Sequence, residues 1–184
     1  MEKTLNQFSA IIDRCKSLFL KKTKDYGTAW RILRPSSLTD QIFIKAKRIR
    51  TIEVKGQQKV DDPLDGEYIG IINYAIMAMI QLELSEEDGL DLPYEVVEIH
   101  YNKQVDETKA LLAMKNHDYG EAWRDMRISS YTDLILMKLL RVKQIEDNDG
   151  KTLVSEGLEA NYRDIINYAI FALVKISEQA LQPK

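Results

Sequence analysis

The sequence predicts an all-α protein, a tandem duplication of a three-helix unit that forms a pseudo-two-fold helical bundle with a shared core. Three observations predict this fold class. The second half of the 184-residue chain repeats motifs of the first half, apolar residues recur at helical spacing in three segments of each half, and glycines separate those segments. A three-helix unit of roughly 90 residues buries little apolar surface alone, so we expect the two copies to pack against each other.

The repeat consists of motifs that return at an offset of 93 residues, or 94 after a one-residue insertion near Asn148. The clearest are D-Y-G at 25–27 and 118–120, A-W-R at 29–31 and 122–124, and I-I-N-Y-A-I at 71–76 and 165–170. Between the copies lies an acidic, glycine-containing segment, which is typical of a linker. The predicted organisation is copy one at residues 1–84, a linker at 85–92 and copy two at 93–184, together one compact domain.

The first helix of each copy is predicted from its apolar face. The residues at steps of three and four are Leu5, Phe8, Ile12, Cys15 and Phe19 in copy one, and Tyr101, Val105, Thr108 and Leu112 in copy two. Gly27 and Gly120 follow, and each ends the helix or forms the turn after it.

The second helix is expected to begin near Ser37 or Ser130, because a serine followed by an aspartate resembles an N-cap with an acidic first turn. Its apolar face is Ile42, Ala46, Ile49 and Ile52 in copy one, and Ile135, Leu139, Val142 and Ile145 in copy two. The third helix of copy one is expected to begin near Pro63. The third helices contain the runs at 71–80 and 165–174, which are apolar on all sides, so we expect them at the centre of the bundle.

Composition excludes several classes of protein and site. A formal net charge of −3 disfavours a strongly basic nucleic-acid binder. With Cys15 as the only cysteine and His100 and His117 as the only histidines, a disulfide within the chain, a cysteine zinc cluster and a multi-histidine metal site are excluded. Apolar runs reach only about ten residues, half of what a membrane span needs, and the N-terminus lacks the apolar segment of a signal peptide. We therefore expect a cytoplasmic protein with no membrane partner, and a homo-oligomer stays open.

A Lys-x-x-Arg pair lies on the second helix of each copy and is the first candidate site. The spacing of three places Lys45 with Arg48, and Lys138 with Arg141, on one helical face beside the apolar stripe. Cations beside a core need anionic partners. They could hold the phosphates of a ligand, or they could form structural ion pairs with Asp40, Asp133, Glu53 or Glu146.

The D-Y-G motif and the tryptophan after it form the second candidate site. Aromatic rings could provide a flat surface for a nucleobase, with the aspartate reading an exocyclic amine. The alternative is a turn that ends the helix, with the rings closing the end of the bundle. The residues concerned are Asp25, Tyr26 and Trp30 in copy one, and Asp118, Tyr119 and Trp123 in copy two.

The polar side of the third helix is the third candidate. At 100° per residue, Glu156, Asp164 and Asn167 can project from one side of it, and Glu146 at the end of the second helix could join them. Such oxygen ligands suit Mg²⁺, the cofactor we expect here. Copy one has Gly70 in place of Asp164 but keeps Asp62 at the position of Glu156, so copy two is the better candidate for a metal site. Helix capping charge and buried amides bonded to the backbone are the structural alternatives.

These motifs resemble a bacterial family called the nucleotide-modification-associated domain, the first of that name, whose members typically carry two copies in a chain of this size. The resemblance rests on K-x-x-D-Y-G-x-A-W, S-S-x-T-D, K-x-x-R-I-x-x-I-E and the I-I-N-Y-A-I helix, and it covers nearly the whole chain. It implies a role with nucleotides. A more distant similarity is to the MazG-like all-α nucleoside triphosphate pyrophosphohydrolases, which hold Mg²⁺ on Glu-x-x-Glu and Glu-x-x-Asp pairs. Glu156, Glu159, Asp164 and Asn167 resemble the second pair, and the Lys-x-x-Arg pairs stand where the first would be.

Three hypotheses of function follow, none with an assigned catalytic residue. The first is Mg²⁺-dependent hydrolysis of the phosphate chain of a nucleotide. The second is a module that binds a nucleotide or nucleotide-like small molecule without catalysis, which explains the cations better. The third is a helical scaffold for structure or interaction, in which the repeated motifs serve packing and capping only.

Overall fold

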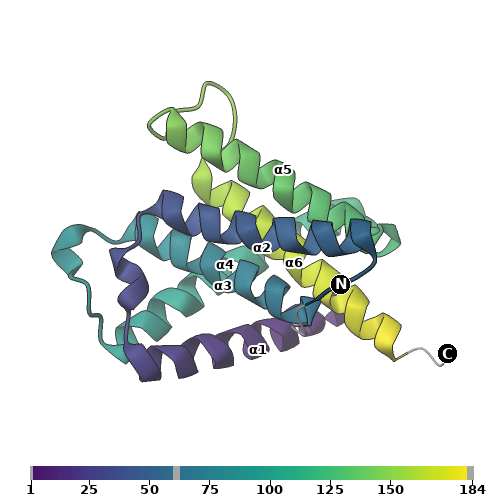
Figure 1. Ribbon diagram of the computed structural model, residues 1–184, viewed down its shortest axis with the longest axis horizontal. Coiled ribbons are helices and arrows are strands. Elements are labelled where there is room, and N and C mark those ends of the chain that lie inside the picture. Colours follow the sequence, from purple (N-terminus) through teal and green to yellow (C-terminus); the bar gives the residue numbers. More distant parts are fainter. Residues whose placement is uncertain (1, 60–62, 182–184) are drawn as a thin grey trace.

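A computed structural model of the chain describes residues 2–59 and 63–181. These residues form α-helices and short 3-10 helices and include no strand (Figure 1), which confirms the all-α prediction. The helices are α1 (Glu2–Tyr26), η1 (Ala29–Ile32), α2 (Pro35–Lys55), α3 (Leu64–Glu83), η2 (Glu86–Asp88), α4 (Tyr94–Tyr119), η3 (Ala122–Asp125), α5 (Ile128–Asp147) and α6 (Leu158–Ala180). None of the helices in this part of the chain is long and apolar enough to cross a membrane.

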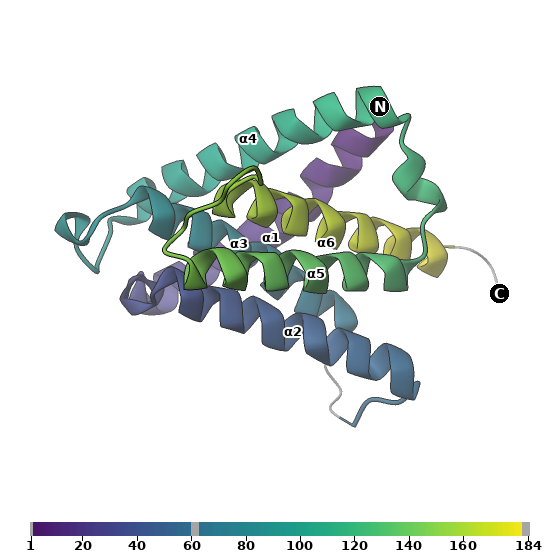
Figure 2. The same ribbon diagram turned by 90° about the horizontal axis from the view of Figure 1, so that it is seen from above.

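The α-helices stack in three layers, and each layer pairs the same helix from the two copies. The third helices, α3 and α6, lie side by side in the middle. The pair α2 and α5 covers one side of them, and α1 and α4 cover the other (Figures 1 and 2). This pairing of equivalent helices is the predicted pseudo-two-fold bundle.

The middle layer contains the two segments that are apolar on all sides. In α3, every residue from Ile71 to Ile80 is buried except Tyr74 and Met77. In α6, every residue from Asn161 to Val174 is buried except Arg163 and Tyr168. A helix that is apolar all round needs neighbours on every side, and only the central position provides them.

The outer helices cross from one copy to the other, so the core is shared. Helix α1 packs against α6 as well as α3, and α4 packs against α3 as well as α6. The buried apolar residues of both copies form one continuous cluster. The described part of either copy therefore does not enclose a core by itself.

The chain ends its first helices as predicted but begins its second helices earlier. Gly27 and Gly120 have φ values of 64° and 60°, in the left-handed region that glycine adopts at little cost. Helix α2 begins at Pro35 and α5 at Ile128, not at Ser37 or Ser130. In α2 a proline fits the first helical position because that position needs no backbone donor, so Ser37 falls inside the first turn. Helix α5 begins at the equivalent Ile128 without a proline. Helix α3 begins at Leu64, one residue after the predicted start.

Candidate functional site

The same cavity is formed in both copies, where the first helix ends beside the third. In copy two it lies between the end of α4, η3 and α6 and has a volume of about 390 Å³. In copy one, the end of α1, η1 and α3 enclose about 150 Å³. We call these the copy-two cavity and the copy-one cavity. Polar and aromatic residues lining the copy-two cavity include Lys115, Asn116, Tyr119, Trp123, Asp164 and Asn167.

The turn after α4 brings the tryptophan of the repeated motif onto α6. Gly120 and Glu121 both adopt left-handed conformations, and this turn leads the chain back over the bundle. The Trp123 ring then stacks on Phe171, with ring centroids 4.2 Å apart and planes 6° from parallel. Arg124 covers the Trp123 ring, with its guanidinium carbon 4.3 Å from the ring centroid. Trp123 is therefore a fixed wall of the cavity.

The D-Y-G motif divides into buried and exposed parts. Trp30 and Trp123 are buried, whereas Tyr26 and Tyr119 are exposed at the edges of the two cavities, Tyr119 by 74%. Asp25 and Asp118 are also exposed but line neither cavity, and Asp118 lies 3.1 Å from His117 Nδ1. The aromatic residues of the motif are thus a buried tryptophan and an exposed tyrosine at the edge of each cavity.

A buried carboxylate in copy two is held between two lysines. Asp164 accepts from Lys138 Nζ at 2.6 Å through Oδ2 and from Lys115 Nζ at 2.6 Å through Oδ1. The Lys138 and Asp164 side chains are only 9% and 8% exposed. Burial lowers the pKa of Lys115, but the hydrogen bond and the charge of Asp164 outweigh it, so that pKa is raised.

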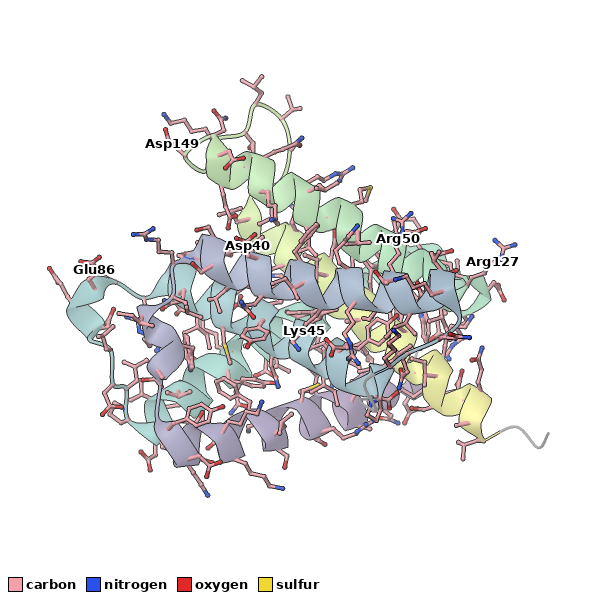
Figure 3. All side chains as sticks on the ribbon, in the orientation of Figure 1. Asp40, Lys45, Arg50, Glu86, Arg127 and Asp149 are labelled. Atoms are coloured by element: carbon pink, nitrogen blue, oxygen red, sulfur yellow. The ribbon has the colours of Figure 1, made fainter. Side chains whose placement is uncertain are left out.

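Copy one pairs its cations differently, because Gly70 stands where copy two has Asp164. Lys45 and Arg48 both bind Glu67, with Lys45 Nζ 3.2 Å from Glu67 Oε2. Figure 3 shows Lys45 on the side of α2 that faces α3. A Cβ atom on Gly70 would lie 2.6 Å from Lys45 Cε, so the lysine side chain occupies the space of a side chain at position 70.

The ion-pair partners suggested by the sequence are wrong for these cations. Asp40 pairs with Lys143 and Asp133 with Arg50, two equivalent contacts between the copies. The true partners, Glu67 and Asp164, lie on the third helices at positions that the repeat does not match. Each copy therefore neutralises its repeated lysine with a carboxylate at a different position.

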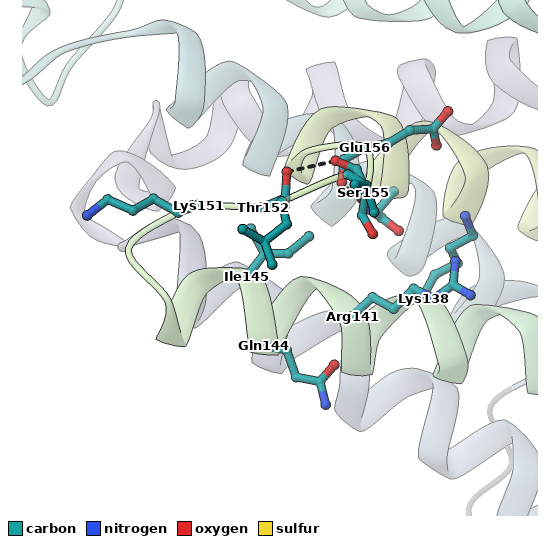
Figure 4. Close-up of a pocket in the computed structure, with 11 residues that line it drawn as sticks. Lys138, Arg141, Gln144, Ile145, Lys151, Thr152, Ser155 and Glu156 are labelled. Carbon is teal, nitrogen blue, oxygen red and sulfur yellow. Dashed lines mark hydrogen bonds between the residues drawn. The ribbon is translucent and has the colours of Figure 1, made fainter.

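A second, larger cavity lies beside this site, between α5 and the segment before α6. It measures about 710 Å³, and we call it the cationic cavity because Lys138, Arg141 and Lys151 line it. Figure 4 shows Lys138 and Arg141 extending from α5 to the same side, with Gln144 on the other side of the helix. Arg141 is exposed and has no ion-pair partner within residues 2–59 and 63–181. Since Lys138 lines this cavity and Asp164 lines the copy-two cavity, their ion pair separates the two.

The four residues predicted as metal ligands are not brought together. Asp164 and Asn167 line the copy-two cavity, whereas Glu156 is exposed at the rim of the cationic cavity and Glu146 faces the other copy. In the described ranges, no three His, Cys, Asp or Glu residues gather as a possible metal site. Because two ammonium groups already neutralise Asp164, this arrangement does not fit Mg²⁺, and the metal stays a prediction. Asp62, the copy-one counterpart of Glu156, lies outside the described residues.

Glu146 belongs to a buried polar network that also occurs twice. Thr39 Oγ1 donates to Glu146 Oε1 at 2.7 Å and lies 2.6 Å from the Tyr162 hydroxyl. The equivalent set is Glu53, Thr132 and Tyr68, with distances of 2.9 and 3.1 Å from Thr132. In each set the threonine comes from the other copy, so these networks join the copies rather than face a ligand.

This network makes stability depend on pH. Burial raises the pKa of Glu146, although the Thr39 hydrogen bond opposes it. Between the ordinary pKa of a glutamate in the unfolded chain and the raised pKa of Glu146 in the folded chain, the folded state binds more protons than the unfolded state. The free energy of unfolding therefore falls as pH rises through this range. Glu146→Gln is always neutral, and we expect it to gain stability relative to the native chain between pH 4 and pH 7 in urea unfolding. Glu87→Gln, at an exposed position, is the control. If the difference in free energy of unfolding between Glu146→Gln and the native chain is the same at every pH, Glu146 does not have a raised pKa.

Sequence reasoning missed Lys115 and Asn116 as site residues. Lys115 is the first residue of the K-x-x-D-Y-G motif, and its counterpart Lys22 lines the copy-one cavity. The repeated lysine was therefore a usable signal. Asn116 is not part of a repeated motif, because copy one has Thr23 at the equivalent position. The repeat therefore gave no signal for it.

Comparison with known proteins gives one family. A family model described as nucleotide modification associated domain 1 matches residues 22–82 and 115–176, about two thirds of the chain in two repeats. No curated protein and no solved structure matches the chain significantly. The two matched regions confirm the family resemblance and the tandem repeat. The similarity to MazG-like enzymes finds no support in them and stays a prediction.

Proposed function

We propose that this chain, which belongs to the nucleotide modification associated domain 1 family, binds a nucleotide or nucleotide-like ligand in copy two without hydrolysing it. One observation supports this proposal above all. A cavity with aromatic walls and buried amides adjoins a cavity lined by cations, and the Lys138–Asp164 pair lies between them.

The two cavities suit the two ends of a nucleotide. The copy-two cavity offers the exposed ring of Tyr119 for stacking on a planar base, since aromatic rings bind bases by stacking. Trp123, whose ring is already packed between Phe171 and Arg124, forms a wall beside the base. The cationic cavity offers Arg141 with no carboxylate partner in the described chain, and guanidinium groups bind phosphate through paired hydrogen bonds. The base would lie between η3 and α6, and the phosphates beside α5.

Lys138 and Lys115 contribute charge rather than free donors. Both bind Asp164 at 2.6 Å, and the three groups together carry one net positive charge. This charge would attract phosphate to the boundary between the cavities, where an approaching anion meets Lys115, which is 42% exposed. Metal-free binding of this kind differs from the hydrolase hypothesis, which requires free carboxylates for Mg²⁺.

Thermal shift and calorimetry against nucleoside mono-, di- and triphosphates, with and without Mg²⁺, test the proposal. A nucleotide at a hundred times its dissociation constant should stabilise the chain by about 2.7 kcal/mol. Release of phosphate or pyrophosphate in the same samples would support the hydrolase instead. A flat screen with all nucleotides would favour the scaffold hypothesis and contradict binding.

Arg141→Ala should weaken nucleotide binding about tenfold or more, because a charge-assisted hydrogen bond to phosphate contributes roughly 1.5 to 3 kcal/mol. Arg141 is exposed, so its loss should leave folding unchanged. Arg48→Ala is the matched control at the equivalent position of copy one, where Glu67 already binds the guanidinium. Isothermal titration of both variants measures the difference. Equal affinities for the two variants would contradict a phosphate site in the cationic cavity.

A further inference from the structure

The repeated cavities contain the same asparagine in two different states. Asn73 on α3 lines the copy-one cavity, and its counterpart Asn167 on α6 lines the copy-two cavity. Both side chains are buried, Asn167 with only 4% of its surface exposed. A buried carboxamide needs partners for its donor and its acceptor, because leaving them unpaired costs stability.

The chain itself satisfies the amide of Asn73. Its Nδ2 donates to the Cys15 carbonyl at 3.1 Å, and its Oδ1 accepts from the Tyr101 hydroxyl at 2.9 Å. Tyr101 comes from α4, so the contact depends on the crossing of the first helix of copy two over the third helix of copy one. The fold thus satisfies the amide of copy one with a tyrosine from copy two.

The amide of Asn167 has no such partners. Neither Nδ2 nor Oδ1 makes a hydrogen bond to the described residues, and both atoms are shielded from solvent. The position equivalent to Tyr101 is Phe8, which has no hydroxyl group. Asn116 Nδ2 in the same cavity also lacks a partner among residues 2–59 and 63–181, whereas its counterpart Thr23 donates to the Phe19 carbonyl at 3.0 Å.

The cavity beside Asn167 is also larger than the cavity beside Asn73. Lys45 lines the copy-one cavity and covers Gly70, whereas Lys138 is held behind Asp164 and does not line the copy-two cavity. The copy-two cavity is therefore the larger, about 390 against 150 Å³, although Asp164 and Phe171 replace the smaller Gly70 and Met77. The copy-one cavity is narrowed by Lys45, whereas the copy-two cavity keeps more room and has amide atoms with no hydrogen-bond partner among the described residues.

We propose that Asn167 selects the heterocycle of the ligand, by pairing with a ring edge on which a hydrogen-bond donor and an acceptor are adjacent, and that copy two alone has this role. The inference rests on the proposed function. A carboxamide matches such an edge through two parallel hydrogen bonds, and Asn116 Nδ2 supplies a further donor for a ring acceptor. Because the amide atoms are shielded, the ring must displace a neighbouring side chain, and Tyr119 at the edge can move with little loss of packing.

The difference between Phe8 and Tyr101 gives a direct test. Phe8→Tyr should place a hydroxyl on the Asn167 amide as Tyr101 does on Asn73, so the variant should melt at a higher temperature than the native chain. The probes are the nucleoside 5′-triphosphates and inorganic tripolyphosphate, which has the phosphates without a base. We expect the best triphosphate to bind the native chain at one site and at least tenfold more tightly than tripolyphosphate. Phe8→Tyr should lose most of that difference and leave tripolyphosphate binding unchanged.

Two further variants keep the test decisive. Asn167→Ala should weaken binding of the same triphosphate as Phe8→Tyr does. Tyr101→Phe removes the hydroxyl that binds Asn73 of copy one and should bind the triphosphate like the native chain. Two sites per chain, or unchanged triphosphate binding by both Phe8→Tyr and Asn167→Ala, would overturn the inference. Equal affinity for triphosphates and tripolyphosphate would overturn it while leaving the phosphate site intact. Binding of neither class would overturn the proposed function itself.

Discussion

Replacing Asp164 by asparagine is expected to lower the free energy of unfolding by about 3 kcal/mol, because it leaves Lys138 charged and almost completely buried without its carboxylate. The second lysine adds to the cost, since two ammonium groups would then face each other without an anion between them. For a chain of this length, the melting temperature should fall by roughly 6–12 °C. Urea and thermal unfolding measure the change.

The equivalent ion pair in copy one provides the control for Asp164→Asn. Glu67→Gln also leaves two cations without a carboxylate, but Lys45 and Arg48 are each 26% exposed and can turn toward water. We expect a loss of about 1 kcal/mol or less there. A double variant, Asp164→Asn with Lys138→Met, should recover much of the loss, because it removes the buried charge. Equal losses at the two positions would show that burial does not set the cost.

Arg31→Ala is the second substitution with a large expected effect, and it acts on the linker. The buried Arg31 side chain, 8% exposed, donates from Nε to the Gly89 carbonyl at 3.2 Å and from its terminal nitrogen to the Ser85 carbonyl at 2.7 Å. It also binds the Gln81 side chain. Because hydrogen bonds from a charged group contribute roughly 1.5 to 3 kcal/mol each and are not additive, we expect a loss of about 2 to 3 kcal/mol.

The linker should become accessible when Arg31 is removed. A protease specific for glutamate should cut at Glu86 or Glu87 at least tenfold faster in Arg31→Ala than in the native chain, because the segment opens locally without unfolding the bundle. Arg34→Ala is the control, since Arg34 is exposed and near the same segment. Mass spectrometry of early fragments locates the cut. Similar rates for both variants would mean that Thr28, which binds Leu90 and Leu92, is enough to hold the linker.

The repeat and the hydrophobic pattern were sufficient to predict the architecture. The same helical pattern occurs in both copies, and the third helix of each copy is apolar on all sides. This pattern predicts a central pair of third helices flanked by the other helices. Helix ends at Gly27 and Gly120 were predictable from the left-handed conformation that glycine favours. The start of α2 was not, because the proline at position 35 fits the first turn better than Ser37 fits the cap.

The partners of the site residues could not be predicted from the repeat. Glu67 and Asp164 neutralise equivalent lysines from positions that are not equivalent, so each partner is visible only when the helices are packed. Glu146 has the pattern of a metal ligand in the sequence, but its hydrogen bond to Thr39 depends on a contact between the copies. The pattern named candidate residues, and the packing decided which of them share a cavity.

The crossing of α1 over α6 and of α4 over α3 has a consequence for how the chain could be divided. A chain cut at the linker gives two segments that each supply a cover for the other's central helix. Neither segment should fold when it is produced alone. Mixed together, the two segments should assemble into the native bundle by fragment complementation. Each segment could then be fused to a different protein, and assembly of the bundle would report that the two fused proteins are close together.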